Sequence, residues 1–147
     1  MNAIQLILTQ HSRIKKYLLQ LSKSKTPLSL EKTFNKISEY LTSHETMEQK
    51  VWYPFLKKNI SLKSTITLLI AEEKSAAKEI AKIKKIKSKD NLMEKIMKLN
   101  SSVAQHAKDE ETKLLPKVKK LIDDSDLKII GKKMREFQKK WDMRQKA

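Results

Sequence analysis

Two stretches of eleven residues, 62 positions apart, constrain the fold of this chain more than any other feature. Residues 44–54 read HETMEQKVWYP and residues 106–116 read HAKDEETKLLP, so His, Glu and Pro occupy the same places in both. The same offset pairs apolar residues elsewhere, for example Ile37 with Leu99. A repeat of this kind indicates two copies of one supersecondary unit, here a helical hairpin, related by a pseudo-twofold axis.

The segments around these stretches have the apolar periodicity of helices. One glycine and three prolines among 147 residues supply few of the turns that a β-rich fold needs, which predicts an all-α fold. Five helices are expected at about 3–22, 30–58 (with Ser29 as the N-cap), 62–87, 92–122 and 123–144. The connections are short, SKDN at 88–91 among them, so the first four helices should form an up-down-up-down bundle.

Residues 1–122 are therefore predicted to form the bundle, and residues 123–147 a fifth helix packed on it within the same domain. The residues expected to face the core are Ile4, Ile7, Leu8, Ile14, Leu18 and Leu21 in the first helix and Phe34, Ile37, Leu41, Val51 and Phe55 in the second. The last helix carries a stripe of Ile130, Met134, Phe137 and Trp141. Packing against the bundle is the expected role of this stripe, and a partner or membrane surface is the alternative.

Composition narrows the classes of function. The absence of cysteine excludes disulfides, thiolate metal sites and cysteine nucleophiles, so any metal must be held by nitrogen and oxygen. The start has no basic n-region and no stretch reaches roughly 20 apolar residues, which argues against a signal peptide or membrane span and favours a cytoplasmic protein. The net charge of +16 raises nucleic acid as a partner, but the cationic residues are nearly all Lys and are spread along the chain, which disfavours that partner.

Five residues of the repeat region have the types and spacing of metal ligands. His44 and Glu48, like His106 and Glu110, lie four positions apart, so each pair shares one helix face. The third histidine of the chain, His11, lies among aliphatic residues of the first helix. Each of these side chains can therefore be directed into the interior of the predicted bundle.

The repeat offset adds a sixth residue. Adding 62 to His11 gives Glu73, on the apolar side of the third helix, where a carboxylate is costly unless it is paired or bound to metal. The predicted ligands are His11, His44, Glu48, Glu73, His106 and Glu110. Three imidazoles and three carboxylates suit iron or manganese, and two divalent ions would neutralise the carboxylates. By symmetry Glu48 and Glu110 would bridge the ions. The remaining ligands would divide as His11 and His44 on one ion, and Glu73 and His106 on the other.

Taken singly, these residues have simpler explanations. A lone buried histidine is more often a satisfied core residue than a ligand, and a lone His–Glu pair at i and i+4 is usually a surface feature. The shared symmetric pattern is what favours metal. HETME also differs from the zinc-protease motif HExxH, because Glu48 stands where the second histidine must be.

Other polar residues near the ligands, and the two motif prolines, carry weaker expectations. Glu45, Asp109 and Glu111 are expected at the surface, with contacts to the ligands as the alternative. Pro54 and Pro116 are expected to let each helix bend or end beyond its ligands, since proline removes a backbone hydrogen bond.

With these motifs assembled, the chain resembles the hemerythrin-like, HHE cation-binding domains. Their pattern is a histidine in the first helix, H-x3-E followed by an aromatic residue and proline in the second, a histidine in the third, and H-x3-E ending in a similar proline in the fourth. The matching stretches here are HSRIKKYL with His11, HETMEQKVWYP, EEKSAAKEI with Glu73, and HAKDEETKLLP, within residues 1–122.

The resemblance implies a four-helix bundle that holds two iron ions, as Fe2+ or Fe3+ with an oxo or hydroxo bridge as an option, and with manganese or zinc as alternative metals. The chain departs from the family pattern at Glu73, where histidine is usual, and at Ala77, where oxygen carriers have a further histidine. In this it is similar to hemerythrin-like iron sensors that use a glutamate ligand. An anion in place of imidazole stabilises Fe(III), which disfavours reversible oxygen carriage.

The predicted function is that of a di-iron protein that senses or reacts with oxygen, peroxide, nitric oxide or iron supply, so that its ligand would be a small diatomic molecule or peroxide. These residues neither require nor exclude catalytic turnover. One alternative is a basic interaction module, in which metal stabilises the fold and the lysine-rich surface binds nucleic acid, membrane or protein. Iron storage is the other.

Overall fold

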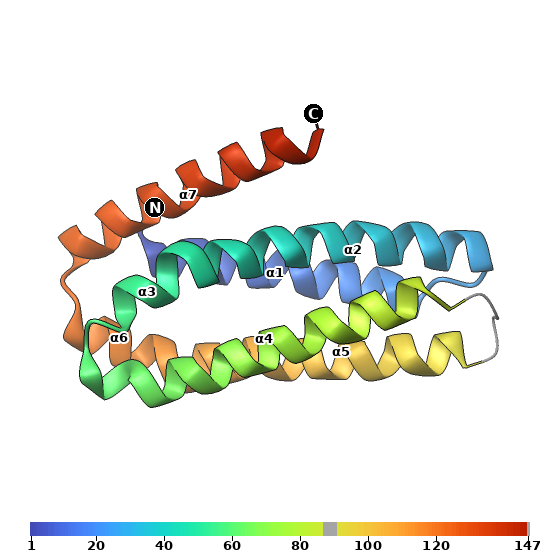
Figure 1. Cartoon of the computed structure of the whole chain (residues 1–147), viewed down its shortest axis with the longest axis horizontal. Coiled ribbons are helices and arrows are strands. Elements are labelled where there is room, and N and C mark those ends of the chain that lie inside the picture. The colour runs from blue at the N-terminus through green and yellow to red at the C-terminus, as the bar shows by residue number, and fades with distance from the viewer. Residues whose placement is uncertain (87–90, 147) are drawn as a thin grey trace.

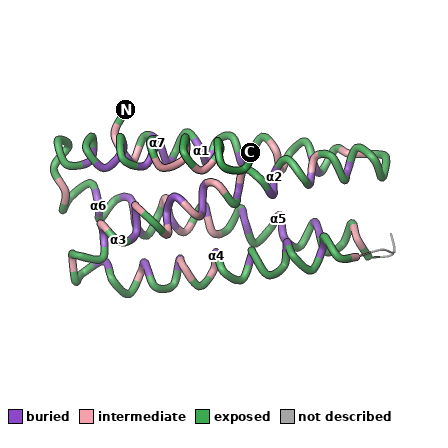
Figure 2. Tube along the Cα trace, turned by 45° about the horizontal axis from the view of Figure 1, so that its top comes forward, coloured by how far each residue is buried: buried purple, intermediate pink, exposed green. Residues whose placement is uncertain are grey.

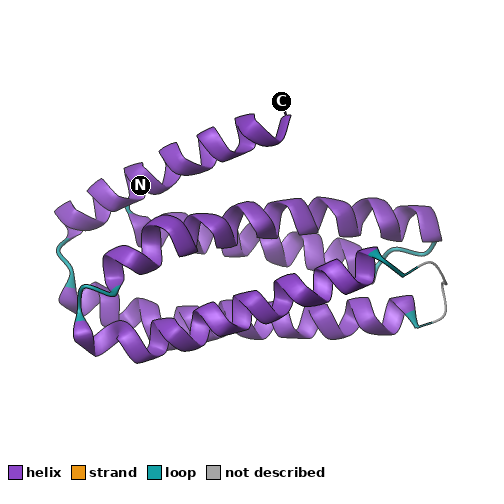
Figure 3. Ribbon diagram, in the orientation of Figure 1, coloured by secondary structure: helices purple, strands orange, loops and turns teal. Residues whose placement is uncertain are grey.

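The computed structural model describes residues 1–86 and 91–146, and every regular element in this part of the chain is helical. The elements are α1 (Ala3–Ser22), α2 (Pro27–Met47), the π-helical turn η1 (Glu48–Trp52), α3 (Tyr53–Leu56), the 3₁₀ turn η2 (Ile60–Leu62), α4 (Lys63–Lys84), α5 (Leu92–Asp109), the π-helical turn η3 (Glu110–Leu114), α6 (Leu115–Leu121) and α7 (Asp124–Lys146). Figure 3 shows these helices joined by short loops. The prediction of an all-α fold is confirmed.

The long helices lie side by side. Figure 1 shows α1, α2, α4 and α5 with successive long helices running in opposite directions, and α7 tilted across the outer side of α1 and α2. α1 packs along α2, α4 packs along α5, and α7 contacts both α1 and α2. Each copy of the sequence repeat is thus a helical hairpin, and α7 covers the first copy.

The helix ends lie near the expected positions, with two differences. α2 begins at Pro27 instead of after Ser29, because the Thr26 hydroxyl accepts a hydrogen bond from the Ser29 backbone N–H and proline fits the first turn of a helix. α4 ends at Lys84, whereas the sequence predicted an end near residue 87. The predicted connection at 88–91 falls mostly on residues 87–90, which lie outside the described residues.

In both halves, the helix that carries the H-x3-E motif widens into a π-helical turn at the motif glutamate, Glu48 in η1 and Glu110 in η3. In each turn the backbone N–H of the residue before the motif proline donates to the carbonyl of that glutamate, five positions back. Pro54 and Pro116 account for the widening, because proline has no N–H and its ring clashes with the carbonyl four residues back. The helices had been expected to bend or end beyond the predicted ligands. The irregularity instead begins at the motif glutamates themselves.

The widened turn also shifts the apolar stripe of the second helix by one position. Val51 and Phe55, which were predicted to face the core, are only partly buried, and Trp52, Tyr53 and Leu56 are fully buried instead. A π-helical turn holds one more residue than an α-helical turn, so the residues after it are rotated relative to an unbroken helix. A prediction based on an unbroken 3.6-residue period is wrong from this point onward.

Two apolar clusters fill the bundle, one on either side of the level of the predicted ligands. In α1, Ile7 belongs to the first cluster and Ile14 to the second, and the buried His11 lies between them. The buried positions follow the inner sides of the helices (Figure 2). Leu8, predicted to face inward, is instead 42% exposed, and Leu6 is buried in the first cluster. Polar ligands at this level are therefore enclosed by aliphatic layers.

α7 docks closely against the start of the chain. Ile130 and Met134 of its apolar stripe are buried in the first cluster. A Cβ atom at Gly131 would lie 2.8 Å from the backbone nitrogen of Ala3, so glycine permits this close approach. Within residues 1–86 and 91–146, none of the helices has both the length and the apolar character needed to cross a membrane.

Candidate metal centre

The six residues predicted as ligands meet at one level of the helices. Their donor atoms form two groups, in each of which all three atoms lie within 4.8 Å of one another. We name the group of His11, His44 and Glu110 position 1, and the group of Glu48, Glu73 and His106 position 2. Either group could hold a metal ion, and the division of histidines between them is the one that the repeat predicts. Ligation itself stays a prediction.

The histidines direct one ring nitrogen at the carboxylates. His11 Nε2 lies 3.0 Å from Glu110 Oε1, and His44 Nε2 lies 3.1 Å from Glu48 Oε1. At position 2, His106 Nε2 lies 3.0 Å from Glu73 Oε2. All three carboxylates are at most 1% exposed. Nitrogen and oxygen donors therefore face one another in a space closed to bulk water.

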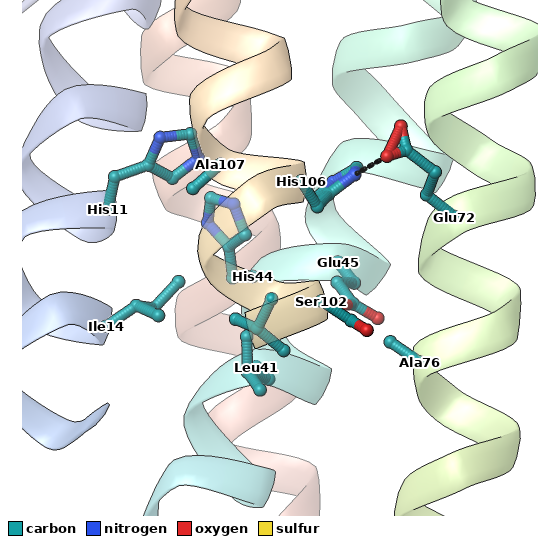
Figure 4. Close-up of a pocket in the computed structure, with 11 residues that line it drawn as sticks. His11, Ile14, Leu41, His44, Glu45, Glu72, Ala76, Ser102, His106 and Ala107 are labelled. Carbon is teal, nitrogen blue, oxygen red and sulfur yellow. Dashed lines mark ion pairs between the residues drawn. The ribbon is translucent and has the colours of Figure 1, made fainter. Parts of the chain in front are cut away.

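The other ring nitrogen of each histidine faces a polar partner. His44 Nδ1 donates to Gln10 Oε1 at 2.7 Å, and His11 Nδ1 donates to Glu111 Oε2 at 2.9 Å. His106 Nδ1 lies 3.7 Å from Glu72 Oε2, the contact marked in Figure 4. In His11 and His44 the acceptor at Nδ1 keeps the proton there and leaves Nε2 free to bind a metal, which is how partners around metal sites orient histidine.

Further donors hold the carboxylates. The Tyr53 hydroxyl lies 2.8 Å from Glu110 Oε2 and 3.0 Å from Glu73 Oε2, within donating distance of both. Gln49 Nε2 donates to Glu73 Oε1 at 3.0 Å. Neither of these contacts was predicted from the sequence.

The repeat offset could have identified four of these supporting residues. Gln10 and Glu72 are 62 positions apart, and so are Gln49 and Glu111. Gln10 and Glu72 contact the motif histidines, His44 and His106 respectively. Gln49 and Glu111 contact the ligands Glu73 and His11, which lie in the first helix of each hairpin. Polar residues on a charged helix do not stand out singly, so their roles become visible only when the copies are aligned.

Two of the residues expected at the surface lie elsewhere. Glu111 contacts His11, which corrects the surface expectation in favour of its alternative. Glu45 is buried, and burial followed by the charge of Glu73 raises the pKa of its carboxyl well above the usual value. Asp109 is half-buried and pairs with Lys113 and Gln105.

The two equivalent glutamates have opposite electrostatic environments. Burial and the neighbouring Glu110 raise the pKa of Glu48 well above its usual value. Burial alone would raise the pKa of Glu110 as well, but its close contacts with Glu48 and His11 lower it below the usual range. The environment thus disfavours the charged form of Glu48 and favours the charged form of Glu110.

The two motif histidines differ in the same way. Burial and the nearby His11 lower the pKa of His44 to about 4. Burial would also lower the pKa of His106, but its contact with Glu73 and the charges of other carboxylates raise it to about 9. One imidazole is therefore neutral and the other charged near pH 7.

Orphaned polar atoms show how well a metal fits this centre. Both Glu48 oxygens, Glu110 Oε1 and His44 Nε2 are buried and form no hydrogen bond within the described residues, although histidine nitrogens lie 3.0 and 3.1 Å from two of these oxygens. A buried polar atom without a hydrogen bond costs roughly 1–3 kcal/mol. Four such atoms close together therefore need an explanation. Metal ions bound by these atoms would satisfy them, and the nitrogen and oxygen donors suit iron, manganese or zinc.

A small cavity adjoins the three histidines (Figure 4). Its volume is about 20 Å³, and its other walls are Ile14, Leu41, Glu45, Glu72, Ala76, Ser102, Val103 and Ala107. A cavity of this size holds about one water-sized molecule. Ala76 lines it, whereas Ala77, the position of a further histidine in oxygen carriers, is exposed.

Comparison with known proteins finds one matching family. A family described as the Hemerythrin HHE cation binding domain matches residues 2–118. No curated protein and no solved structure matches the chain. The matched range includes all six predicted ligands and ends before α7.

Proposed function

Because the chain belongs to the hemerythrin HHE cation-binding family, we propose that it holds two iron ions, one at position 1 and one at position 2, with Glu48 and Glu110 bridging. The single observation that carries this proposal is the set of buried donor atoms without partners, which belong to both positions. Manganese and zinc remain the alternative metals. The helical arrangement in Figure 1 supports an up-down-up-down bundle over residues 1–122, with residues 123–147 packed on it in one domain.

We further propose that the centre senses or reacts with oxygen, peroxide, nitric oxide or iron supply. Iron would supply redox chemistry and affinity for a small molecule. The cavity of about 20 Å³ beside His11, His44 and His106 supports a diatomic or similarly small ligand. Its aliphatic walls, together with the fully buried Trp52 and Tyr53, exclude bulk water.

The residues at position 2 disfavour reversible oxygen carriage. Glu73 and Glu48 give this position two carboxylates and one imidazole. A second anion stabilises Fe(III) relative to Fe(II), whereas reversible carriage requires ready return to Fe(II). The Tyr53 hydroxyl and the Gln49 amide hold Glu73 in place, so the carboxylate is part of the centre's organisation.

The net charge of +16 favours a second candidate, a basic interaction module whose metal only stabilises the fold. A His44→Ala variant separates the two functions. If it loses metal and keeps both folding and partner binding, the second candidate is supported. Iron storage, the remaining alternative, would be shown by uptake well beyond two irons per chain.

Anaerobic reconstitution with Fe(II), followed by metal counting and absorption spectra after exposure to oxygen or nitric oxide, tests the proposal. The expected result is about two irons per chain, because two donor groups are present. Glu48→Ala should lower this number, and Glu79→Ala should not, since Glu79 lies at the surface beside Lys82. Fewer than about one iron per chain would overturn the proposal.

A further inference from the structure

α7 contacts the two residues that directly precede the histidines of position 1. Gln138 hydrogen-bonds to Gln10, the residue before His11, and Asp142 accepts a hydrogen bond from Ser43, the residue before His44. In the part of the chain that the structure describes, no such bond joins α7 to a neighbour of Glu73 or His106. The fifth helix, which lies beyond the matched family range, thus reaches one side of the metal centre.

A chain of hydrogen bonds connects α7 to His44. Gln10 Nε2 donates to Gln138 Oε1 at 2.7 Å, and Gln138 Nε2 donates back to Gln10 Oε1 at 3.1 Å. The same Gln10 oxygen accepts from His44 Nδ1 at 2.7 Å. The two carboxamides therefore form a reciprocal pair, with one oxygen shared between α7 and the imidazole.

The orientation of the Gln10 amide decides which nitrogen of His44 can bind a metal. A carboxamide has a donor end and an acceptor end. If Gln10 turned over, its NH₂ group would face Nδ1, so the imidazole would carry its proton on Nε2 and could not offer that nitrogen to a metal. Turning Gln10 alone would break both of its bonds to Gln138, and this opposes the change.

Removing Gln138 would expose the amide to water. A polar cleft of about 520 Å³ lies over this pair, lined by Gln10, Tyr17, Gln20, Lys36, Glu39, Tyr40, Ser43, Gln138 and Asp142. Water can donate to or accept from either end of an amide, so it would no longer favour one orientation of Gln10.

The equivalent position in the second half does not need such a support. His106 faces Glu72, whose carboxylate is the repeat counterpart of the Gln10 amide. Both oxygens of a carboxylate are acceptors, so turning the group changes nothing for the histidine. The half that uses an amide is the half that α7 covers.

We propose that Gln138 is a positioning residue that fixes the orientation of Gln10 and thereby keeps His44 Nε2 free for metal at position 1. α7 then acts on the metal affinity of position 1 more strongly than on that of position 2. By linkage, metal at position 1 stabilises the docking of α7 by the same free energy. The predicted effect on metal affinity rests on the proposed function. The predicted position of the proton on His44 does not.

The test compares Gln138→Leu with the control Gln145→Leu on the exposed end of α7. In metal-free protein, ¹⁵N NMR should find the His44 proton on Nδ1 in wild type and in Gln145→Leu. Gln138→Leu should shift a measurable fraction of this proton to Nε2. A wild-type proton on Nε2, or no change in Gln138→Leu, would overturn the inference.

Stepwise anaerobic titration with Fe(II) supplies the second readout. Gln138→Leu should weaken one of the two binding steps by about tenfold and the other step less, because loss of a partner behind a metal ligand typically costs 10- to 100-fold. Gln145→Leu should weaken neither step. Equal weakening of both steps in Gln138→Leu would overturn the inference. Absence of any metal binding by wild type would instead refute the proposed function, and the NMR result would still test the orientation.

Discussion

The two halves of this chain share a backbone plan and differ in chemistry. His11 of the first half corresponds to Glu73 of the second, so position 1 has two imidazoles and one carboxylate, while position 2 has one imidazole and two carboxylates. Each half widens into a π-helical turn at its motif glutamate. The backbone symmetry brings two donor groups together, and the substitutions within it make the two metal positions unequal.

The difference extends to the support of the motif glutamates. Tyr53 lies within donating distance of Glu110, but the repeat counterpart of Tyr53 is the apolar Leu115. Glu48 has no hydrogen-bond partner within the described residues. The opposite pKa shifts of the two glutamates are consistent with this asymmetry.

The largest effect should come from exchanging each motif glutamate for glutamine. Both Glu48→Gln and Glu110→Gln should weaken metal binding by at least about 100-fold, because each removes an anionic ligand. Without metal they should differ. Glu48→Gln should cost less stability than Glu110→Gln, since burial and Glu110 disfavour a charge on Glu48, whereas Glu110→Gln should cost about 1–3 kcal/mol by removing the charge that His11 and Tyr53 contact.

Metal titration and denaturant unfolding of the metal-free variants measure both quantities. Two outcomes would contradict the asymmetry: equal destabilisation of the metal-free proteins, or metal affinity close to that of wild type in either variant.

The next effect concerns pH, where His44 and His106 should act in opposite directions. The pKa of His106 is raised to about 9, so its stabilisation of the metal-free fold is complete below about pH 6.5 and is lost as pH rises through 9. At about 1.4 kcal/mol per unit of pKa, this loss is roughly 3 kcal/mol. The pKa of His44 is lowered to about 4, so its burial destabilises the fold as pH falls below 6.5.

Unfolding of metal-free protein between pH 4 and pH 9 tests this pair. His106→Gln should be less stable than wild type near pH 6.5 and should lose less stability between pH 6.5 and 9. Glu48, whose pKa is also raised, should add a loss of stability with rising pH in wild type and variant alike. Metal-loaded protein should lack the decline, because bound metal displaces the protons. An unchanged alkaline decline in His106→Gln would show that another group causes it.

The smallest effect should come from Tyr53→Phe. Loss of the hydroxyl removes a hydrogen bond to buried carboxylates and should destabilise the metal-free protein by about 1 kcal/mol. Tyr17→Phe is the matched control, since the Tyr17 ring is partly buried and packs edge-on against Tyr40 at 5.6 Å. Thermal unfolding of both variants measures the difference. Equal stability of the two variants would mean that the Tyr53 hydroxyl does not support Glu110.

The sequence alone predicted the helical fold and the convergence of six residues, because both follow from periodicity and from one offset. His11 and Glu73 were found as a pair, and the structure buries both at the same level. The same offset contained Gln10 and Glu72, but a polar residue on a charged helix resembles a solvated one until its burial is known.

The remaining errors have local physical causes. Val51 and Phe55 were placed in the core because an unbroken helical period was extended through η1, where a proline-induced π-helical turn adds a residue. The role of Gln138 could not be predicted from the sequence for a different reason. Its role depends on where α7 docks, and that contact joins residues 128 positions apart.

Anomalous scattering at the iron edge from crystals of the reconstituted protein tests the central claim most directly. We predict two iron peaks at the level of His11, the first ligated by His11, His44 and Glu110 and the second by Glu48, Glu73 and His106, with Glu48 and Glu110 reaching both. A single peak, no peak at this level, or a second iron that Glu73 does not ligate would contradict the account.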